Sequence, residues 1–105
     1  MEEKIICAAI WYKEFPLIKD DFPQGFQRPI NCDSGMVFCG LRHHNCMYQA
    51  ISITGKYQIK LGEEVQGFLT NKNRFVDRKE AANIHKSNGG HMEFSSIKLF
   101  SEDLY

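Results

Sequence analysis

The sequence lacks an excess of charge of either sign, because thirteen Lys and Arg residues balance thirteen Asp and Glu residues. A protein that holds duplex DNA mainly by neutralising phosphates needs a surplus of positive charge, so we expect no duplex DNA partner. A membrane-spanning run is also lacking. The longest apolar stretch, residues 5–12, is less than half of a span, and the Glu2-Glu3-Lys4 segment before it is not typical of a signal peptide. We therefore expect a cytoplasmic protein with no membrane contact.

Motifs for common nucleotide chemistry are missing as well. The sequence has no glycine-rich phosphate loop of the dinucleotide or Walker type, and no recognisable nucleophile motif. Without an export signal, we expect a reducing compartment and free thiols at the four cysteines, positions 7, 32, 39 and 46. The sequence therefore predicts a protein that is not an enzyme and carries no cofactor.

What is present fits one small domain over residues 1–105. Hydrophobic residues make up 43% of the chain and charged residues 25%, as in soluble globular proteins. At this length folding buries roughly 65% of the unfolded surface, which gives a stable core but leaves little room to wall off a large ligand. We therefore expect a deep pocket to need a second subunit.

The pattern predicts an α+β fold, with a mainly antiparallel sheet and two helices at about residues 41–54 and 78–87. Gly55 ends the first helix, and the capping box of Asp77 and Glu80 begins the second. Residues 5–12 are apolar on both faces, which is typical of a fully covered strand. Further strands are expected at residues 36–39, 57–61, 65–70, 74–76 and 97–100.

All three prolines fall between residues 13 and 34, so this stretch reads as a long irregular loop. Loops of this length are usually functional or mobile. Phe15, Leu17, Phe22 and Phe26 are expected to pin it to the domain.

A first candidate site contains five residues of the kinds that bind zinc, namely Cys32, Cys39, His43, His44 and Cys46. Their spacing does not match the usual zinc knuckles, and neighbouring helical histidines point about 100° apart. The competing interpretation is that the cysteines are small core residues.

A phosphate is the other candidate ligand, since Arg42, His43 and His44 lie where a helix begins and its amide groups favour anions. Alternatively, one histidine is a satisfied residue at the edge of the core.

A second candidate site combines two aromatic and two basic residues, Phe68, Arg74, Phe75 and Arg78. Aromatic faces stack on bases for roughly 1–3 kcal/mol each, and guanidinium groups bind phosphates through two parallel hydrogen bonds. The combination suits a nucleotide. The alternative is that Phe68 and Phe75 are core residues of a hairpin and that Arg78 is solvated.

Four segments together resemble a family of small phage proteins. They are the Ala8-Ala9-Ile10 strand, the run from Cys39 to Cys46, the stretch from Gly67 to Ala82, and the closing segment from Leu99 to Tyr105. The chain resembles the first-described family of Thoeris anti-defence proteins, phage sponges that capture the cyclic ADP-ribose signal of a bacterial immune system.

The resemblance implies a protein in the cytoplasm of the infected bacterium that binds a glycocyclic ADP-ribose isomer without degrading it, and so starves the Thoeris effector of its activator. Members are similarly described as homo-oligomers that enclose the ligand between subunits, and some also bind cyclic oligonucleotides at separate sites. On chemical grounds, Phe68 or Phe75 would stack on adenine, Arg74 and Arg78 would meet the pyrophosphate, and Arg28 would belong to a lid. Arg42, His43 and His44 would hold phosphate or ribose across the interface, and residues 101–103 would bind ribose or clasp the fold.

Nanomolar capture corresponds to about 12 kcal/mol, which a few stacking and charge-assisted contacts reach only in a preorganised, dry site. We therefore expect a homodimer or higher homo-oligomer with twofold symmetry. Two other functions stay open: an enzyme that cleaves a cyclic nucleotide with His43 or His44 as acid or base, and a zinc-stabilised module that binds protein partners.

Overall fold

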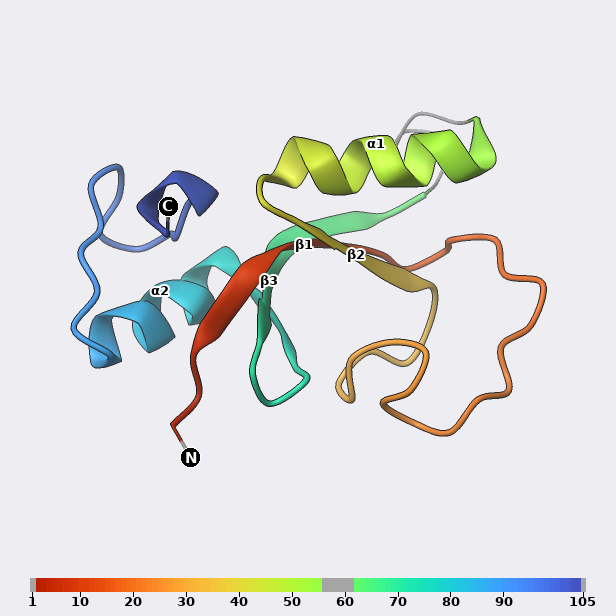
Figure 1. Ribbon diagram of the computed structural model, residues 1–105, viewed down its shortest axis with the longest axis horizontal. Coiled ribbons are helices and arrows are strands. Elements are labelled where there is room, and N and C mark those ends of the chain that lie inside the picture. The colour runs from red at the N-terminus through yellow and green to blue at the C-terminus, as the bar shows by residue number, and fades with distance from the viewer. Residues whose placement is uncertain (1, 56–61, 105) are drawn as a thin grey trace.

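The computed structural model describes residues 2–55 and 62–104. Within them an antiparallel sheet has the strand order β2-β1-β3-β4 and is joined by two α-helices and a short 3₁₀ helix (Figure 1). The elements are β1 (Ile5–Tyr12), β2 (Met36–Gly40), α1 (His43–Thr54), β3 (Glu64–Thr70), β4 (Phe75–Asp77), α2 (Arg78–Ser87) and η2 (Ser101–Asp103). The predicted α+β class is confirmed. The strand expected at residues 57–61 lies outside the described residues.

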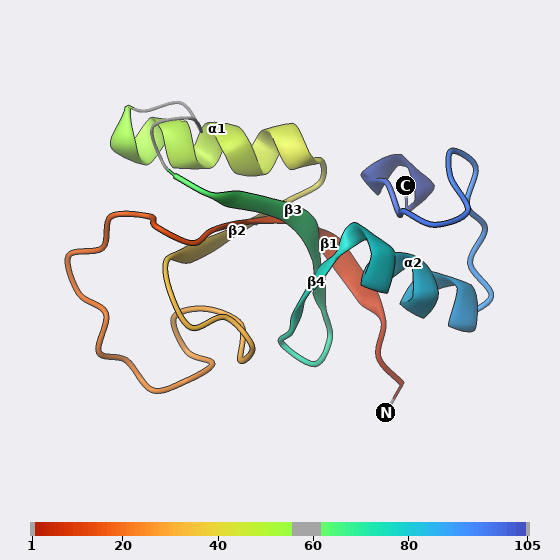
Figure 2. The same ribbon diagram turned by 180° about the vertical axis from the view of Figure 1, so that it is seen from behind.

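β1 is an inner strand with both faces covered, as its apolar sequence predicts. Ile10 and Tyr12 are buried beneath α1, and Ala8 is buried in the cluster that contains Ala81 and Ala82 of α2. On the opposite face Ala9 packs in a third cluster, which includes Cys32 from the long loop. The helices therefore cover one face of the sheet, and the loop covers part of the other (Figures 1 and 2).

Local signals fix the ends of both helices. Gly55 ends α1 in the left-handed region with φ of 70°, and its N–H donates to the Ile51 carbonyl at 2.6 Å. The carboxylate of Asp77 accepts a hydrogen bond from the Glu80 N–H at 2.8 Å and begins α2. α1 begins at His43, two residues later than expected, and α2 has the expected bounds. As a result, His43 and Arg78 are the first residues of their helices.

The strand predicted at residues 97–100 is wrong. Leu99 is fully buried among the α2 alanines, and its N–H donates to the carbonyl of Arg78 at 2.9 Å, so the segment crosses the start of α2 instead of pairing with a strand. Of the two aliphatic residues in this segment, only Leu99 inserts into the core, because Ile97 is 61% exposed. The chain then turns into η2 next to the start of α1 (Figure 1).

The loop over residues 13–34 is irregular, as expected, but only part of the predicted anchoring is correct. Phe15 is buried and Leu17 packs against it, whereas Phe22 and Phe26 are 50% and 82% exposed. Other contacts attach the second half of the loop to the sheet. The Ile30 N–H donates to the Asn73 carbonyl at 2.9 Å, and the Asn31 side chain bonds to both the N–H and the carbonyl of Phe75.

All four cysteines are free thiols, in agreement with the sequence prediction. In the described part of the chain, no helix has both the length and the apolar character needed to cross a membrane.

Candidate functional site

The first turns of α1 and α2 and the end of the chain meet at one place (Figures 1 and 2). We call this place the Arg78 site. It consists of Arg42 before α1, His43 in α1, Gln66 in β3, Arg78 in α2 and Phe100 before η2. These residues come from sequence segments far apart, so only the folded chain assembles them.

Arg78 is held in one orientation by several partners. Its guanidinium donates to the Leu99 carbonyl at 2.9 Å, to Gln66 Oε1 at 2.9 Å and to His43 Nδ1 at 3.3 Å. The guanidinium carbon also lies 4.9 Å from the centroid of the Phe100 ring, within the range of a cation–π contact. The positive charge is therefore fixed before any ligand arrives.

His43 positions Arg78 through its tautomer. The Nε2 atom lies 2.8 Å from the Gly67 carbonyl oxygen, which can only accept, so Nε2 carries the proton and Nδ1 is free to accept from Arg78. Burial lowers the pKa of His43, and the nearby charge of Arg78 lowers it further. A neutral imidazole with both nitrogens in hydrogen bonds is suited to fixing the orientation of the Arg78 guanidinium.

An open cavity of about 320 Å³ lies beside Arg78 and is lined by Gln66, Asp77, Arg78, Lys79 and Lys98. Its lining brings three cations against one carboxylate, and that carboxylate is engaged in capping α2. Burial lowers the pKa of Arg78, but a guanidinium remains charged at neutral pH. The cavity therefore suits a small anion such as a phosphate or diphosphate group.

Arg42 belongs to the Arg78 site, and His44 lies beside it. Arg42 donates to the Ser101 carbonyl at 2.8 Å and so ties the end of the chain to the start of α1. His44 is exposed at the second position of α1. Asp103 accepts hydrogen bonds from the backbone N–H groups of Glu93 and Phe100, at 2.9 and 3.0 Å, so its carboxylate clasps the fold.

The two predicted stacking residues lie in the core. Phe68 is fully buried, with the ring of His43 edge-on at 5.2 Å. Phe75 is 5% exposed and packs on the other face of the sheet, with its ring 5.9 Å from that of Trp11. Neither ring offers an open face to a base in this structure. Phe68 instead packs against the imidazole ring of His43.

Arg74 is not part of the Arg78 site, because its guanidinium is engaged in a different network. Its guanidinium makes two hydrogen bonds to Glu3, at 2.8 and 2.9 Å, and another to Glu80 at 2.8 Å. Thr70 donates to the same Glu3 carboxylate at 2.8 Å. Hydrogen bonding to Arg74 lowers the pKa of Glu3 to about 2. The network joins the start of the chain to the β3–β4 hairpin and α2.

This network predicts how the protein responds to acid. Because the pKa of Glu3 is about 2 in the fold and 4.5 ordinarily, its contribution to stability is complete above about pH 4.5 and is lost as the pH falls towards 2. We expect Glu3→Gln to lower the melting temperature at pH 6 and to reduce its further fall between pH 4.5 and 2. Thermal melts at a series of pH values test this. Equal pH slopes in the two proteins would show that the pair contributes nothing.

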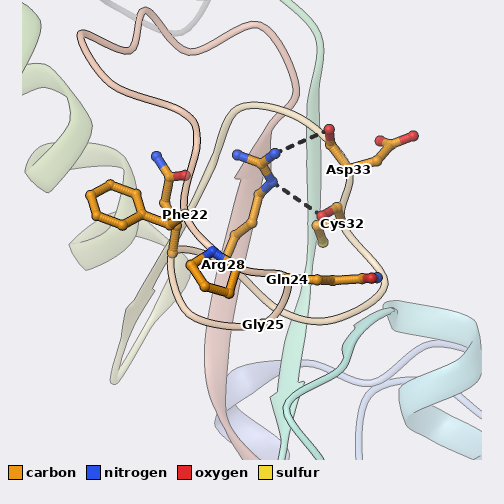
Figure 3. A pocket seen from close by; sticks show the side chains of 8 residues that line it. Phe22, Gln24, Gly25, Arg28, Cys32 and Asp33 are labelled. Atoms are coloured by element: carbon orange, nitrogen blue, oxygen red, sulfur yellow. Dashed lines mark hydrogen bonds between the residues drawn. The ribbon is translucent and has the colours of Figure 1, made fainter.

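Arg28 anchors the loop and lines a second cavity, of about 290 Å³ (Figure 3). Its guanidinium donates to the carbonyls of Cys32 and Asp33, both at 3.1 Å, and pairs with Asp20 at 2.7 Å. Only 15% of its side chain is exposed. The remaining lining residues are Phe22, Pro23, Gln24, Gly25 and Gln27. The guanidinium of Arg28 is therefore already bound by partners within its own loop. This loop forms the wall of the cavity.

One comparison with known proteins gives a match. A family model described as phage T4 y16D protein matches residues 4–105. The chain belongs to this phage protein family. No curated protein and no solved structure matches it. The match covers nearly the whole described domain, including every residue of the Arg78 site.

Of the eight predicted ligand residues, the structure of this phage protein brings Arg42, His43 and Arg78 together. Sequence reasoning missed Gln66, Lys79, Lys98 and Phe100. The signal for Lys79 was its place beside Arg78 in the first turn of α2, whereas Gln66, Lys98 and Phe100 approach only through tertiary contacts. Within residues 2–55 and 62–104, no three His, Cys, Asp or Glu side chains are grouped as metal ligands, so the structure adds no support for the zinc alternative.

Proposed function

We propose that this phage protein binds a small cyclic nucleotide of the ADP-ribose type at the Arg78 site and sequesters it intact. By lowering the free concentration of such a signal, it blocks activation of a bacterial Thoeris effector. The observation that carries the proposal is the guanidinium of Arg78, fixed by Gln66 and His43 at the edge of a cationic cavity. The pyrophosphate of the ligand lies against Arg78, Lys79 and Lys98.

Tight capture supports a role for a second copy of the chain. The cavity beside Arg78 is open, and an open site leaves water around the charged groups that bind phosphate. Nanomolar affinity, about 12 kcal/mol, needs a preorganised site from which water is excluded. A twofold partner that closes over the cavity supplies the missing wall and an aromatic or apolar surface for the base.

The geometry of His43 favours binding over cleavage. A general base needs a free lone pair, but Nδ1 of His43 accepts from Arg78 and Nε2 donates to the Gly67 carbonyl. Burial also lowers the pKa of His43, so it is a poor proton donor at neutral pH. The exposed His44 is the remaining candidate for the cleaving alternative, and recovery of an intact ligand after binding distinguishes the two functions.

The exposed lysines of the cavity allow a test that spares the core. We expect Lys79→Ala and Lys98→Ala each to weaken the binding of a cyclic ADP-ribose isomer about tenfold, which corresponds to about 1.4 kcal/mol for one lost phosphate contact. Isothermal titration calorimetry of the whole chain measures the dissociation constants.

Lys72→Ala is the matched control, because Lys72 is exposed in the turn between β3 and β4 and does not line the cavity. The dissociation constant of Lys72→Ala should equal that of the unchanged protein. Equal affinities for all three lysine variants would show that the ligand does not bind in the cavity beside Arg78. A ligand panel that includes cyclic oligonucleotides tests whether the chain has a second nucleotide site. Light scattering during the titration tests the expected homo-oligomer.

A further inference from the structure

Two thiols lie together on the sheet face opposite the helices, Cys7 on β1 and Cys39 on β2. The register pairs Ala9 with Cys39, so Cys7 and Cys39 are diagonal neighbours on one face of two antiparallel strands. Both side chains are half-buried, and the two thiols interact with each other. The capture site proposed above uses neither thiol.

The interaction between the two thiols gives them different chemical roles. It lowers the pKa of Cys7 and raises the pKa of Cys39. Burial raises the pKa of Cys32 and of Cys46 to about 11. Since the thiolate is the nucleophile, we expect Cys7 to react first and Cys39, its neighbour on the same face of the sheet, to react second.

The surroundings leave room for this reaction. Cys39 lines an open groove of about 160 Å³ together with Phe26, Val37 and Leu69. Cys7 lies just beyond the last pair of the β1–β2 ladder, Ala8 with Gly40, and next to an irregularity in the pairing of β1 with β3. Cys7 has no partner on β2 but pairs with Leu69 of β3. Closure of the disulfide therefore shifts the β1 backbone at this irregularity.

We propose that Cys7 and Cys39 form a reversible modification site that reacts with small disulfides and closes into a cross-strand disulfide. The Cys7 thiolate attacks one sulfur of the small disulfide, forms a mixed disulfide and releases one small thiolate. Cys39 then loses its proton and attacks the Cys7 sulfur, which releases the second small thiol. The chain is oxidised by two electrons and the small disulfide is reduced to two thiols.

Oxidised glutathione is the probe. The reduced protein is incubated with it at neutral pH, quenched with acid at intervals, and analysed by intact mass and peptide mapping. We expect a transient adduct of one glutathionyl group on Cys7, followed by a product lacking two hydrogen atoms in which Cys7 is linked to Cys39. Dithiothreitol should restore the starting mass.

Variants separate this pair from nonspecific oxidation. Cys39→Ser should stop at the mixed disulfide on Cys7, and Cys7→Ser should slow modification at least tenfold. Cys32→Ser is the matched control and should behave as the unchanged protein, because Cys32 is buried and belongs to the loop. Circular dichroism checks that each variant is folded. A stable glutathionyl adduct in the unchanged protein, or equal labelling of all four cysteines, would overturn the proposal.

Discussion

Replacing Arg78 by alanine should weaken the binding of a cyclic ADP-ribose isomer at least a hundredfold. The guanidinium is fixed by Gln66, His43 and the Leu99 carbonyl, so it meets phosphate without losing further conformational freedom. Two charge-assisted hydrogen bonds at about 1.5 kcal/mol or more each correspond to roughly a hundredfold change in affinity. Isothermal titration calorimetry measures the loss.

Because Arg78 also joins α2 to the end of the chain, its removal lowers stability as well. Arg78→Lys is the matched variant, since it keeps the positive charge but cannot contact Leu99, Gln66 and His43 at once. We expect it to bind with an affinity between those of the unchanged and the alanine proteins, in titrations below the melting temperature of each protein. An Arg78→Ala chain that is folded and binds with full affinity would exclude the Arg78 site.

Replacing Phe68 by alanine should reduce the free energy of unfolding by about 3–5 kcal/mol, the usual cost of removing a large aromatic side chain from a core. Phe68 is fully buried among Ala8, Val76 and Leu99, and it also supports the ring of His43. Equilibrium unfolding in urea measures the change. Phe26→Ala is the control, because this ring is 82% exposed, and its effect should stay within about 0.5 kcal/mol.

The same position distinguishes a core role from stacking on a base. Phe68→Leu keeps an apolar side chain and removes the aromatic face, so a protein that uses Phe68 only for packing should still capture its ligand when folded. A loss of binding of more than about 1 kcal/mol with an unchanged unfolding curve would instead indicate stacking on the ligand. The burial of Phe68 leads us to expect the first result.

Much of the fold could be predicted from the sequence because its signals are local. β1 is apolar on both faces, Gly55 ends α1, and the Asp77–Glu80 capping box begins α2. The segment over residues 97–100 misled the prediction for a physical reason. Its alternating pattern comes from one buried residue that packs at the start of a helix, which resembles the pattern of a short strand.

The candidate site was only partly predictable. The capping box marks Arg78 as the first residue of α2, whereas α1 begins at His43, two residues later than expected, and the fold brings the two helix starts together. The pairing of Arg74 with Glu3 could not be read from the sequence, because the two residues lie 71 positions apart. Phe22 and Phe26 looked like anchors but are exposed, since Asn31 and Arg28 hold the loop through backbone groups instead. Hydrogen bonds from side chains to backbone groups produce no hydrophobic pattern in the sequence, so these anchors could not be predicted.

In the proposed function, the chain captures a small cyclic nucleotide and does not break it. Capture followed by release tests both halves in one measurement. The protein is mixed with slightly less than one equivalent of a cyclic ADP-ribose isomer and filtered, and the retained fraction is denatured and analysed by mass spectrometry. We predict that the filtrate is depleted of the nucleotide and that denaturation returns it intact. A filtrate with the full amount of nucleotide would rule out capture, and a retained fraction that returns a hydrolysed product would show cleavage instead of sequestration.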